Sequence, residues 1–270
     1  MTLKILKKYS IKAKKSLWQN FLVSEEILNS ISSFLDISWK NILEVWPGYW
    51  ALTEKLLKEK PNSLTLVELD DNMVSILEDR IDNWELETDW IDFNIKNTDV
   101  LKFTPAFSNY YVIANIPYYI TSPILRHFLY DIKNVPQNML ILMQKDVADK
   151  ILWNWKNKSS VLSLFINKKC FTKEVIIVPK ESFIPAPKVE SSVLLFKSHS
   201  LYSDIDDERF LELIKKWFSE PRKKLIKNLI KWWFEKEVIL KAFDNIWVWE
   251  NIRAEDLDIE NWLKIFSYFN

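Results

Sequence analysis

The sequence predicts an α/β protein in which a doubly wound, mainly parallel sheet is followed by a small all-helical domain. Short apolar runs alternate with helix-like stretches over the first two thirds of the chain, which is typical of repeated βα units. Beyond about residue 198 the helical periodicity continues without strand-like runs. The chain has 270 residues, 48% of them hydrophobic, which is enough to build a large buried core.

The elements of the first domain follow from these apolar runs. We expect strands at 41–45, 64–69, 93–96, 110–116 and 139–143, with a late pair at 175–178 and 192–196. Helices are expected at 52–59, 72–81, 122–130 and 145–152. Each helix would return the chain by a right-handed crossover to the next parallel strand.

The second domain is expected to contain helices alone. The helix-like stretches lie at 208–216, 223–231, 236–243 and 260–269. The polar segment 198–207 fits a linker. We therefore predict domains at 1–198 and 199–270.

Composition excludes several classes of protein. No run approaches the roughly 18 apolar residues that a membrane span needs, and residues 1–15 lack the apolar core of a signal peptide. A single cysteine, Cys170, with only two histidines argues against an internal disulfide or a zinc cluster. We expect a cytoplasmic protein without a metal or a membrane partner.

Basic residues gather in two places although the formal net charge is zero. Six lysines precede the first acidic residue, Glu25, and a second run at 215–231 holds seven basic residues against Glu220. Such runs can follow a nucleic-acid backbone. They equally fit a solubilising tail and a solvated helix face.

Polar side chains end consecutive strands of the predicted sheet. Glu44 and Glu68 close the first two strands, Asp99 follows the third, and Asn115 closes the fourth. In parallel sheets ligands bind at this carboxyl edge, and a carboxylate placed like Glu68 accepts hydrogen bonds from ribose hydroxyls. Any one of these residues can instead cap a helix. Four in succession favour a site for a nucleoside-containing cofactor.

The segment Asn115-Ile116-Pro117-Tyr118 resembles the N-[IL]-P-[YF] box of enzymes that methylate the exocyclic amine of adenine. The lone pair of that amine is delocalised into the ring. The side-chain oxygen of Asn115 and the carbonyl of Pro117 can accept its two hydrogens and favour a pyramidal, nucleophilic nitrogen. Tyr118 would stack on a flipped-out base. The alternative is a strand that ends at a proline turn with a core tyrosine.

Further segments extend the resemblance from this one motif to a whole protein family. The segment 17–22 is similar to G-Q-N-F-L, 183–193 to F-x-P-x-P-K-V-x-S, and 218–225 to F-S-x-x-R-K-x-L. With glycine at Trp46 and Trp50, the turn 44–50 resembles the first motif of S-adenosylmethionine-dependent methyltransferases. In this order, over nearly the whole chain, the motifs resemble the ribosomal RNA adenine dimethyltransferase family, its small-subunit branch above all.

The resemblance implies a Rossmann-like methyltransferase domain that takes methyl groups from S-adenosyl-L-methionine and an RNA-binding helical domain. It places the target adenine at Asn115, Pro117 and Tyr118, with Phe183 as the opposite wall or else a core aromatic. The implied cofactor contacts are Asn20, Leu22, Trp46, Gly48, Glu68, Asp99 and Asn115. The implied RNA contacts are Lys14, Lys15, Arg222, Lys223 and Lys224. The expected partner is small-subunit rRNA in the assembling ribosomal subunit, bound by a monomer.

Two alternatives stay open. One is the sister class that methylates adenine in large-subunit rRNA and confers antibiotic resistance. The segments Pro123–Leu125 and 186–191 argue modestly against it. The other is a non-catalytic RNA-binding assembly or transcription factor with a methyltransferase fold. The intact Asn115 box favours catalysis, whereas Trp46 and Trp50 favour the binding factor.

Glycine and tryptophan are abnormal in number, with one glycine, Gly48, and fourteen tryptophans. Trp18, Trp46 and Trp50 stand where the family has glycine, and Trp217 is a further such case. Other tryptophans stand at turn-like places: 39, 84, 90, 153, 155, 232, 233, 247 and 249. We hypothesise that most are glycine in the native protein, because a UGA codon that the source reads as glycine is translated here as tryptophan. Trp262 fits a genuine tryptophan, and the competing interpretation is a truly tryptophan-rich protein.

Overall fold

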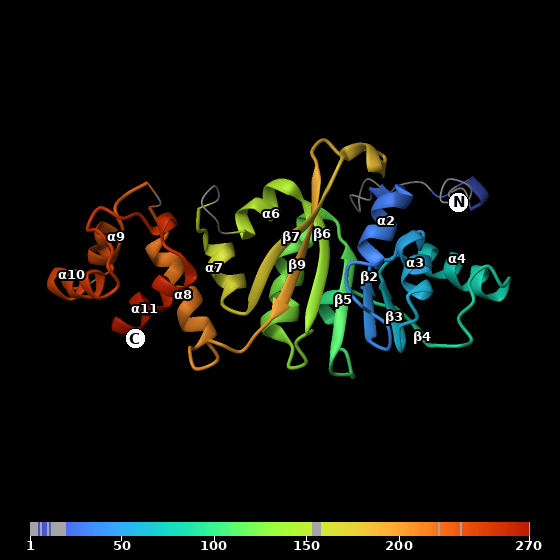
Figure 1. The fold of residues 1–270 in the computed structure, drawn as a ribbon, viewed down its shortest axis with the longest axis horizontal. Coiled ribbons are helices and arrows are strands. Elements are labelled where there is room, and N and C mark those ends of the chain that lie inside the picture. The colour runs from blue at the N-terminus through green and yellow to red at the C-terminus, as the bar shows by residue number, and fades with distance from the viewer. Residues whose placement is uncertain are drawn as a thin grey trace. The chain divides into compact units, whose positions relative to one another are not determined.

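The chain divides into two compact units (Figure 1), Met1–Ala148 with Lys173–Ser198 and Asp149–Thr172 with His199–Asn270. The computed structural model describes residues 20–152, 158–220, 222–232 and 234–269, with residues 5, 7–9 and 11 near the N-terminus, and only the backbone of residue 118. None of the helices in these ranges is long and apolar enough to cross a membrane.

The first unit is built on a seven-stranded sheet in the order β4-β3-β2-β5-β6-β9-β7. Its strands are β2 (Asn41–Val45), β3 (Ser63–Glu68), β4 (Asp92–Asn97), β5 (Tyr110–Asn115), β6 (Asn138–Gln144), β7 (Cys170–Val178) and β9 (Ser191–Ser198). The five neighbouring strands β4, β3, β2, β5 and β6 run parallel to one another, and β9 is antiparallel to β6. The predicted doubly wound, mainly parallel sheet is confirmed.

The strand order reverses between β2 and β5, which pair directly with each other. Val45 lies opposite Ala114 in this pairing, so both strands end at the same level. From β2 the chain winds outward through β3 to β4, and from β5 it winds the other way to β6. Such a switch point leaves a crevice between the loops that follow the two central strands.

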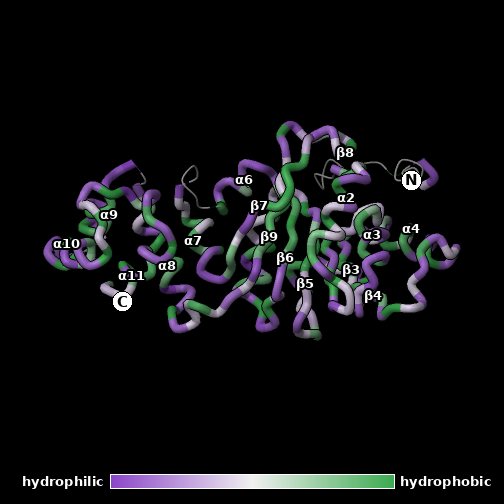
Figure 2. The backbone as a smooth tube through the Cα atoms, in the orientation of Figure 1, coloured by the Kyte–Doolittle hydropathy of each residue, from purple (hydrophilic) through white to green (hydrophobic). Residues whose placement is uncertain are grey.

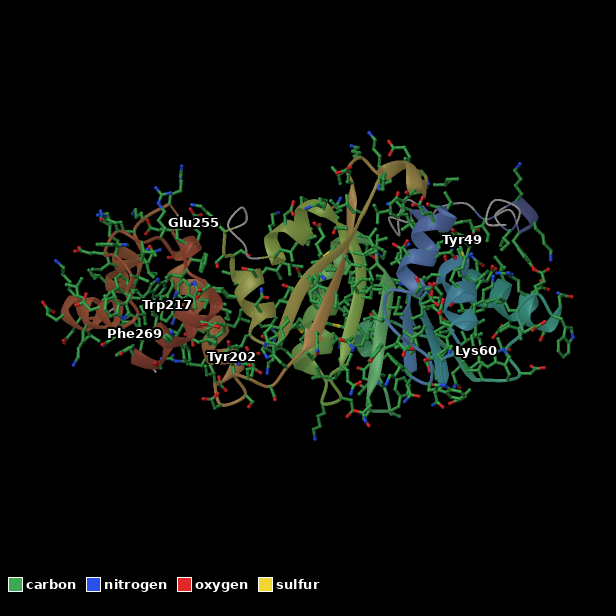
Figure 3. All side chains as sticks on the ribbon, viewed as in Figure 1. Tyr49, Lys60, Tyr202, Trp217, Glu255 and Phe269 are labelled. Atoms are coloured by element: carbon green, nitrogen blue, oxygen red, sulfur yellow. The ribbon has the colours of Figure 1, made fainter. Side chains whose placement is uncertain are left out.

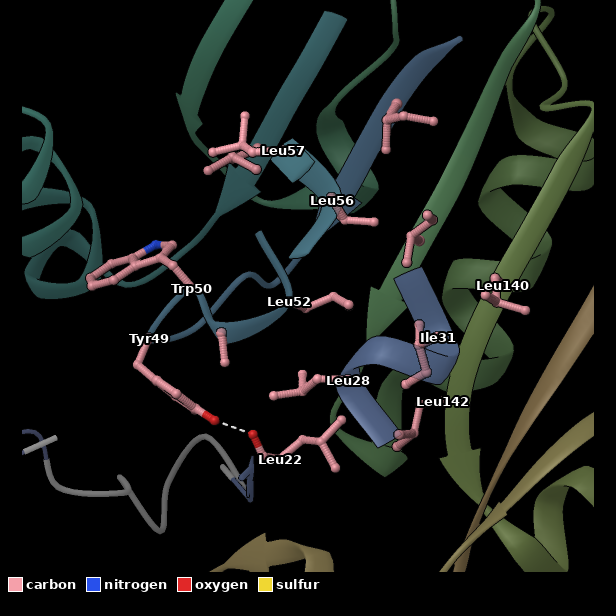
Figure 4. Close-up of a cluster of buried hydrophobic side chains, with 14 of the residues drawn as sticks. Leu22, Leu28, Ile31, Tyr49, Trp50, Leu52, Leu56, Leu57, Leu140 and Leu142 are labelled. Atoms are coloured by element: carbon pink, nitrogen blue, oxygen red, sulfur yellow. Dashed lines mark hydrogen bonds between the residues drawn. The ribbon is translucent and has the colours of Figure 1, made fainter. Parts of the chain in front are cut away.

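Helices cover the sheet because each presents an apolar side to it. They are α2 (Glu25–Ser32), α3 (Ala51–Lys58), α4 (Asp71–Asp82), α5 (Thr121–Arg126), which continues as a π-helical turn over His127–Asp131, and α6 (Lys145–Ile151). In the described part of the chain Leu28, Leu52 and Leu56 pack with Leu140 and Leu142 of the sheet in one buried cluster (Figure 4). Figure 2 shows the hydrophobic residues concentrated along the strands and the hydrophilic ones toward the loops.

A separate two-stranded ribbon lies outside the main sheet. Strand β1 (Phe21–Leu22) pairs antiparallel with β8 (Phe183–Ile184), so that Leu22 lies opposite Phe183. The ribbon therefore joins residues that are about 160 positions apart in the sequence.

The second unit is helical. It contains α7 (Val161–Asn167), α8 (Asp207–Trp217), α9 (Leu225–Lys231), α10 (Lys236–Asn245) and α11 (Ile259–Tyr268). The ring of Trp217 stacks on Trp262 at a centroid distance of 5.2 Å, and Phe269 packs edge-on against Trp217 (Figure 3). The predicted all-helical C-terminal region is confirmed.

The described residues within 149–172 belong to the second unit, whereas the predicted first domain spans 1–198. The buried ammonium group of Lys168 donates to the carbonyl of Ile205 at 2.8 Å and forms an ion pair with Asp207. The amide of Ser159 donates to the carbonyl of Glu255 at 2.8 Å. These contacts join positions far apart in the sequence, so local periodicity carries no sign of them.

Five tryptophans adopt a left-handed backbone: Trp39, Trp46, Trp50, Trp84 and Trp247, with φ between 56° and 68°. Gly48 has φ of 57°. A side chain in this region costs roughly 1–2 kcal/mol, which glycine avoids. The backbone at these five positions therefore supports the glycine hypothesis. The described tryptophans 90, 217, 232, 249 and 262 are not left-handed, so there the backbone gives the hypothesis no support.

Two of these tryptophans end helices in the position that glycine normally takes. After α4, Trp84 donates to the carbonyl of Ile81 at 2.9 Å, and Glu85 donates to that of Arg80 at 2.8 Å. After α10, Trp247 donates to the carbonyl of Asp244, and Val248 to that of Phe243. This pair of bonds defines the Schellman motif, whose left-handed residue is usually glycine.

Trp247→Gly is expected to stabilise the protein by about 1 kcal/mol, because the left-handed strain disappears and the lost indole is 93% exposed. The neighbouring Trp249 is 84% exposed and not left-handed, so Trp249→Gly is the matched control and should destabilise by about 0.5–1 kcal/mol. Urea unfolding of both variants measures the difference. Equal shifts of the two midpoints would contradict the assignment of strain to Trp247.

Candidate active site

A cavity opens at the carboxyl edge of the sheet, between the loops that follow β2 and β5. It encloses about 870 Å³ of empty space, part of it open to solvent. Its wall includes Asn20, Leu22, Trp46, Gly48, Glu68, Asn115 and Pro117. The structure thus brings seven of the predicted site residues, from four separate segments of the chain, to one place.

Glu68 is held by backbone amides at the floor of this cavity. Its Oε1 accepts hydrogen bonds from the amides of Leu69 and Asp70, both at 2.8 Å, and its Oε2 accepts one from Gly48 at 3.4 Å. Burial raises the pKa of Glu68 to about 7, and the three amide bonds oppose that rise. The carboxylate is fixed in orientation, which suits a group that accepts hydrogen bonds from a ribose.

Glu44 forms a second buried carboxyl group beside the first. Its Oε2 accepts a hydrogen bond from the hydroxyl of Thr53 at 2.7 Å. Burial raises the pKa of Glu44 to about 8, and the nearby charge of Glu68 adds to the rise. Two buried carboxyl groups thus line one cavity, where they can accept hydrogen bonds from a polar ligand and donate hydrogen bonds to it.

Stability is expected to fall as the pH rises from about 5 to about 8. The unfolded Glu44 carboxyl ionises near its ordinary pKa of 4.5, whereas the folded one stays protonated to about pH 8. The stabilisation is therefore complete below pH 4.5 and is lost as the pH rises through the folded pKa. Glu44→Gln keeps an acceptor for Thr53 and removes the titration. It should raise the free energy of unfolding at pH 8 by on the order of 2–4 kcal/mol, and change it little at pH 5.

Urea unfolding at both pH values measures this effect. The same change at the exposed Glu26 is the control, because it removes no carboxyl group from the interior. A gain for Glu44→Gln that is independent of pH would show that Glu44 does not titrate in this range.

The turn after β2 approaches the cavity through its backbone. Trp46, Gly48 and Trp50 all have positive φ, and the amide of Trp50 donates to the carbonyl of Pro47 at 2.9 Å. Trp46 is one of the residues that line the cavity. Trp50 is fully buried, with the guanidinium carbon of Arg80 5.7 Å from its ring centroid. In the described part of the chain, neither the Trp50 indole nitrogen nor Nη1 of Arg80 has a hydrogen-bond partner.

The segment Asn115-Ile116-Pro117 forms the opposite wall. Asn115 is the last residue of β5, and Pro117 leads into a short 3-10 turn over Tyr118–Ile120. The amide of Ile120 donates to the carbonyl of Pro117 at 3.2 Å. The side chain of Tyr118 lies outside the described residues, and its neighbour Tyr119 lines the cavity.

Asp99 and Phe183 are placed differently from the other predicted site residues. The carboxylate of Asp99 accepts a hydrogen bond from the amide of Leu101 at 3.0 Å, and Asp99 is not among the described residues that line the cavity. Phe183 is 3% exposed and belongs to the core cluster. Their roles toward cofactor and base stay predictions.

The predicted RNA contacts belong to both ends of the chain. Lys14 and Lys15 lie outside the described residues. Arg222, Lys223 and Lys224 are exposed in the second unit, where Lys223 pairs with Glu220. Lys231 also pairs with Glu220, at 2.8 Å, and the two lysines lower the pKa of this carboxyl to about 2. Arg222, Lys223 and Lys224 are thus consecutive in the sequence and accessible to solvent.

Sequence reasoning missed three features of the site. These are the bond from Thr53 to Glu44, the contribution of Tyr119, and the link between Tyr49 and the ribbon. The position of Thr53 could have indicated its bond to Glu44, because the third residue of a helix that follows a strand can face back toward the end of that strand.

Known proteins are similar to this chain over nearly its whole length. The family model described as ribosomal RNA adenine dimethylase matches residues 10–270. "Ribosomal RNA small subunit methyltransferase A" of Pelagibacter ubique is 34% identical, and the match covers 96% of this chain and 97% of the relative. The protein of the same name from Mycoplasmopsis synoviae is also 34% identical, with the same coverage.

Two solved structures share the fold. A dimethyladenosine transferase from Plasmodium falciparum superposes with a TM-score of 0.78 at 24% identity, covering 93% of this chain and 97% of the other. The 23S rRNA methyltransferase ErmE gives a TM-score of 0.75 at 20% identity, covering 92% and 99%. On the family match and the two relatives, this chain belongs to the ribosomal RNA adenine dimethylase family of methyltransferases.

Proposed function

We propose that this protein transfers methyl groups from S-adenosyl-L-methionine to the exocyclic amines of two adjacent adenosines in small-subunit rRNA. The observation that carries the proposal is that Asn115 and Pro117 line one cavity together with Glu68 at the switch point of the sheet. The names of the relatives point to the small subunit.

The residues of the cavity fit such a cofactor in chemistry. Glu68 would hold the ribose hydroxyls, the backbone at Gly48 would approach the nucleoside, and Asn20 and Leu22 would cover the methionine end. Asp99 would hold the adenine amine of the cofactor, and the amide of the preceding residue, Thr98, donates to the carbonyl of Glu68 at 3.0 Å. The Trp46 indole is the group that would fit poorly, because Trp46 lines the same cavity and stands where the resemblance has glycine.

The cofactor supplies an electrophilic methyl group, and the chain orients the nucleophile. The Asn115 side-chain oxygen and the Pro117 carbonyl would accept the two hydrogens of the target amine. This turns the nitrogen lone pair toward the methyl group, so that positioning provides most of the rate. Tyr118 and Phe183 would stack on the two faces of the flipped base.

The RNA would be held through its phosphates. Arg222, Lys223 and Lys224 are exposed, and the lysines 14 and 15 carry the same charge near the N-terminus. Contacts of this kind position a structured RNA without reading its sequence. We propose that the partner is the assembling small subunit in the cytoplasm, bound by a monomer.

Transfer of labelled methyl groups tests the proposal. Immature small subunits and large-subunit RNA are offered in parallel, to the chain as printed and to one with glycine at the left-handed tryptophans. Label in small-subunit adenosine supports the proposal, and label in large-subunit RNA alone favours the antibiotic-resistance class. RNA binding without transfer by either chain would leave the non-catalytic factor.

A further inference from the structure

The β1–β8 ribbon is too short to hold itself in place. Each strand has two residues, and outside the strands the amide of Val23 donates to the carbonyl of Ser182 at 2.7 Å. A pair of strands needs support from other packing to be stable in water. Contacts to the rest of the first unit therefore decide where the ribbon lies.

Tyr49 provides such a contact from the turn that follows β2. Its hydroxyl donates a hydrogen bond to the carbonyl of Leu22, as Figure 4 shows. Its ring packs edge-on against Phe21, with the centroids 5.3 Å apart and the planes at 87°. Tyr49 is 3% exposed and Leu22 is 2% exposed, so water does not compete for this bond.

The ribbon connects this contact to the opposite side of the site. Leu22 lines the cavity and lies opposite Phe183 in the strand pairing. Tyr49 stands between Gly48, whose amide bonds Glu68, and Trp50. One continuous chain of contacts therefore runs from the cofactor turn through Tyr49 and Leu22 to Phe183.

We propose that Tyr49 is a positioning residue that couples the cofactor turn to the wall for the target base. The inference rests on the proposed function, in which Leu22 covers the cofactor and Phe183 faces the adenine. The hydroxyl is the group to test, because its bond to the carbonyl of Leu22 is directional and fixes the turn to the backbone of β1, whereas the apolar packing of Phe21 is not directional. A bound cofactor that orders the turn would thereby also order the position of Phe183.

Tyr49→Phe removes the hydroxyl and keeps the ring. Tyr110→Phe is the matched control, because the fully buried Tyr110 also donates its hydroxyl to a carbonyl, that of Asn134 at 2.7 Å, at the start of β5 and thus at the other end of the sheet. We expect hydrogen exchange of the Val23 amide and of the amides of 182–184 to become about five- to tenfold faster in Tyr49→Phe. In Tyr110→Phe these amides should exchange as in the parent chain.

Coupling is tested with S-adenosylhomocysteine as the probe. In the parent chain it should slow exchange at 46–50, at 20–23 and at 182–184. In Tyr49→Phe it should still protect 46–50 and no longer protect 182–184, with its Kd changed less than about threefold and kcat lowered about three- to tenfold. If the printed chain does not bind the probe, the chain with glycine at 46 and 50 serves as parent for both variants.

Unchanged exchange at Val23 in Tyr49→Phe, or an equal change in Tyr110→Phe, would overturn the proposal. Retained protection of 182–184 by the probe in Tyr49→Phe would overturn it as well. Absence of methyl transfer by the parent chains would instead count against the proposed function, and the exchange of Val23 would still decide whether Tyr49 holds the ribbon.

Discussion

Asn115→Ala is expected to lower methyl transfer to rRNA by about 10²–10³-fold, the usual cost of removing one group that stabilises a transition state. The side-chain oxygen of Asn115 would accept one hydrogen of the target amine, and alanine has no acceptor there. Asn115 ends β5, where its backbone pairs with Leu142 of β6, so alanine keeps the strand. The loss should therefore appear in kcat.

Two measurements separate this effect from misfolding. Cofactor affinity of Asn115→Ala, determined by calorimetry, should fall by no more than about tenfold, far less than methyl transfer, since Asn115 is one of several implied cofactor contacts and Glu68 and the turn remain. Asn62→Ala is the control, because Asn62 is exposed and bonds Asn41 at the opposite end of the sheet. Full transfer by Asn115→Ala would remove this residue from the reaction.

Trp46→Gly with Trp50→Gly is expected to tighten binding of S-adenosyl-L-methionine about tenfold or more, which corresponds to about 1.4 kcal/mol. Both positions are left-handed, so glycine fits their backbone without strain. The change clears the indole of Trp46 from the cavity wall and gives the buried Nη1 of Arg80 space for water. Methyl transfer should rise with cofactor occupancy.

Trp39→Gly separates this gain from a general relief of strain. Trp39 is also left-handed, but it is 82% exposed and precedes β2, at the end of the sheet away from the cavity. It should increase stability and leave the cofactor Kd unchanged. Calorimetry on both variants measures the contrast. Weaker binding by the Trp46→Gly/Trp50→Gly chain would show that the indoles belong to the site.

Much of the fold can be predicted from the sequence, because runs of apolar residues indicate which segments are buried strands and helices. The strand 41–45 agrees residue for residue with β2, and the other predicted strands overlap their counterparts. The two-residue strands β1 and β8 escape such reasoning, since two residues have no periodicity and their pairing depends on contacts across the chain. Helix α2 was missed as well, although Ser24 at its start is a capping residue.

The site was predictable where chemistry is tied to the end of a strand. Glu68 and Asn115 end β3 and β5, and the sheet topology alone brings them together. The Glu44–Thr53 bond and the Tyr49 hydroxyl depend on how a helix or turn rotates against its neighbours. That rotation is set by the packing of the whole core, so it cannot be predicted from the pattern of a single sequence.

The placement of α7 has a practical consequence for dividing the chain. Leu164, Phe165 and Ile166 of α7 are buried, and α7 packs against α8 within the second unit. A protease that cleaves only at 199–206 would produce two fragments, with α7 on the first and α8 on the second. The fragments should remain associated and co-elute in gel filtration. Expressed alone, residues 1–198 would expose the apolar side of α7 and self-associate.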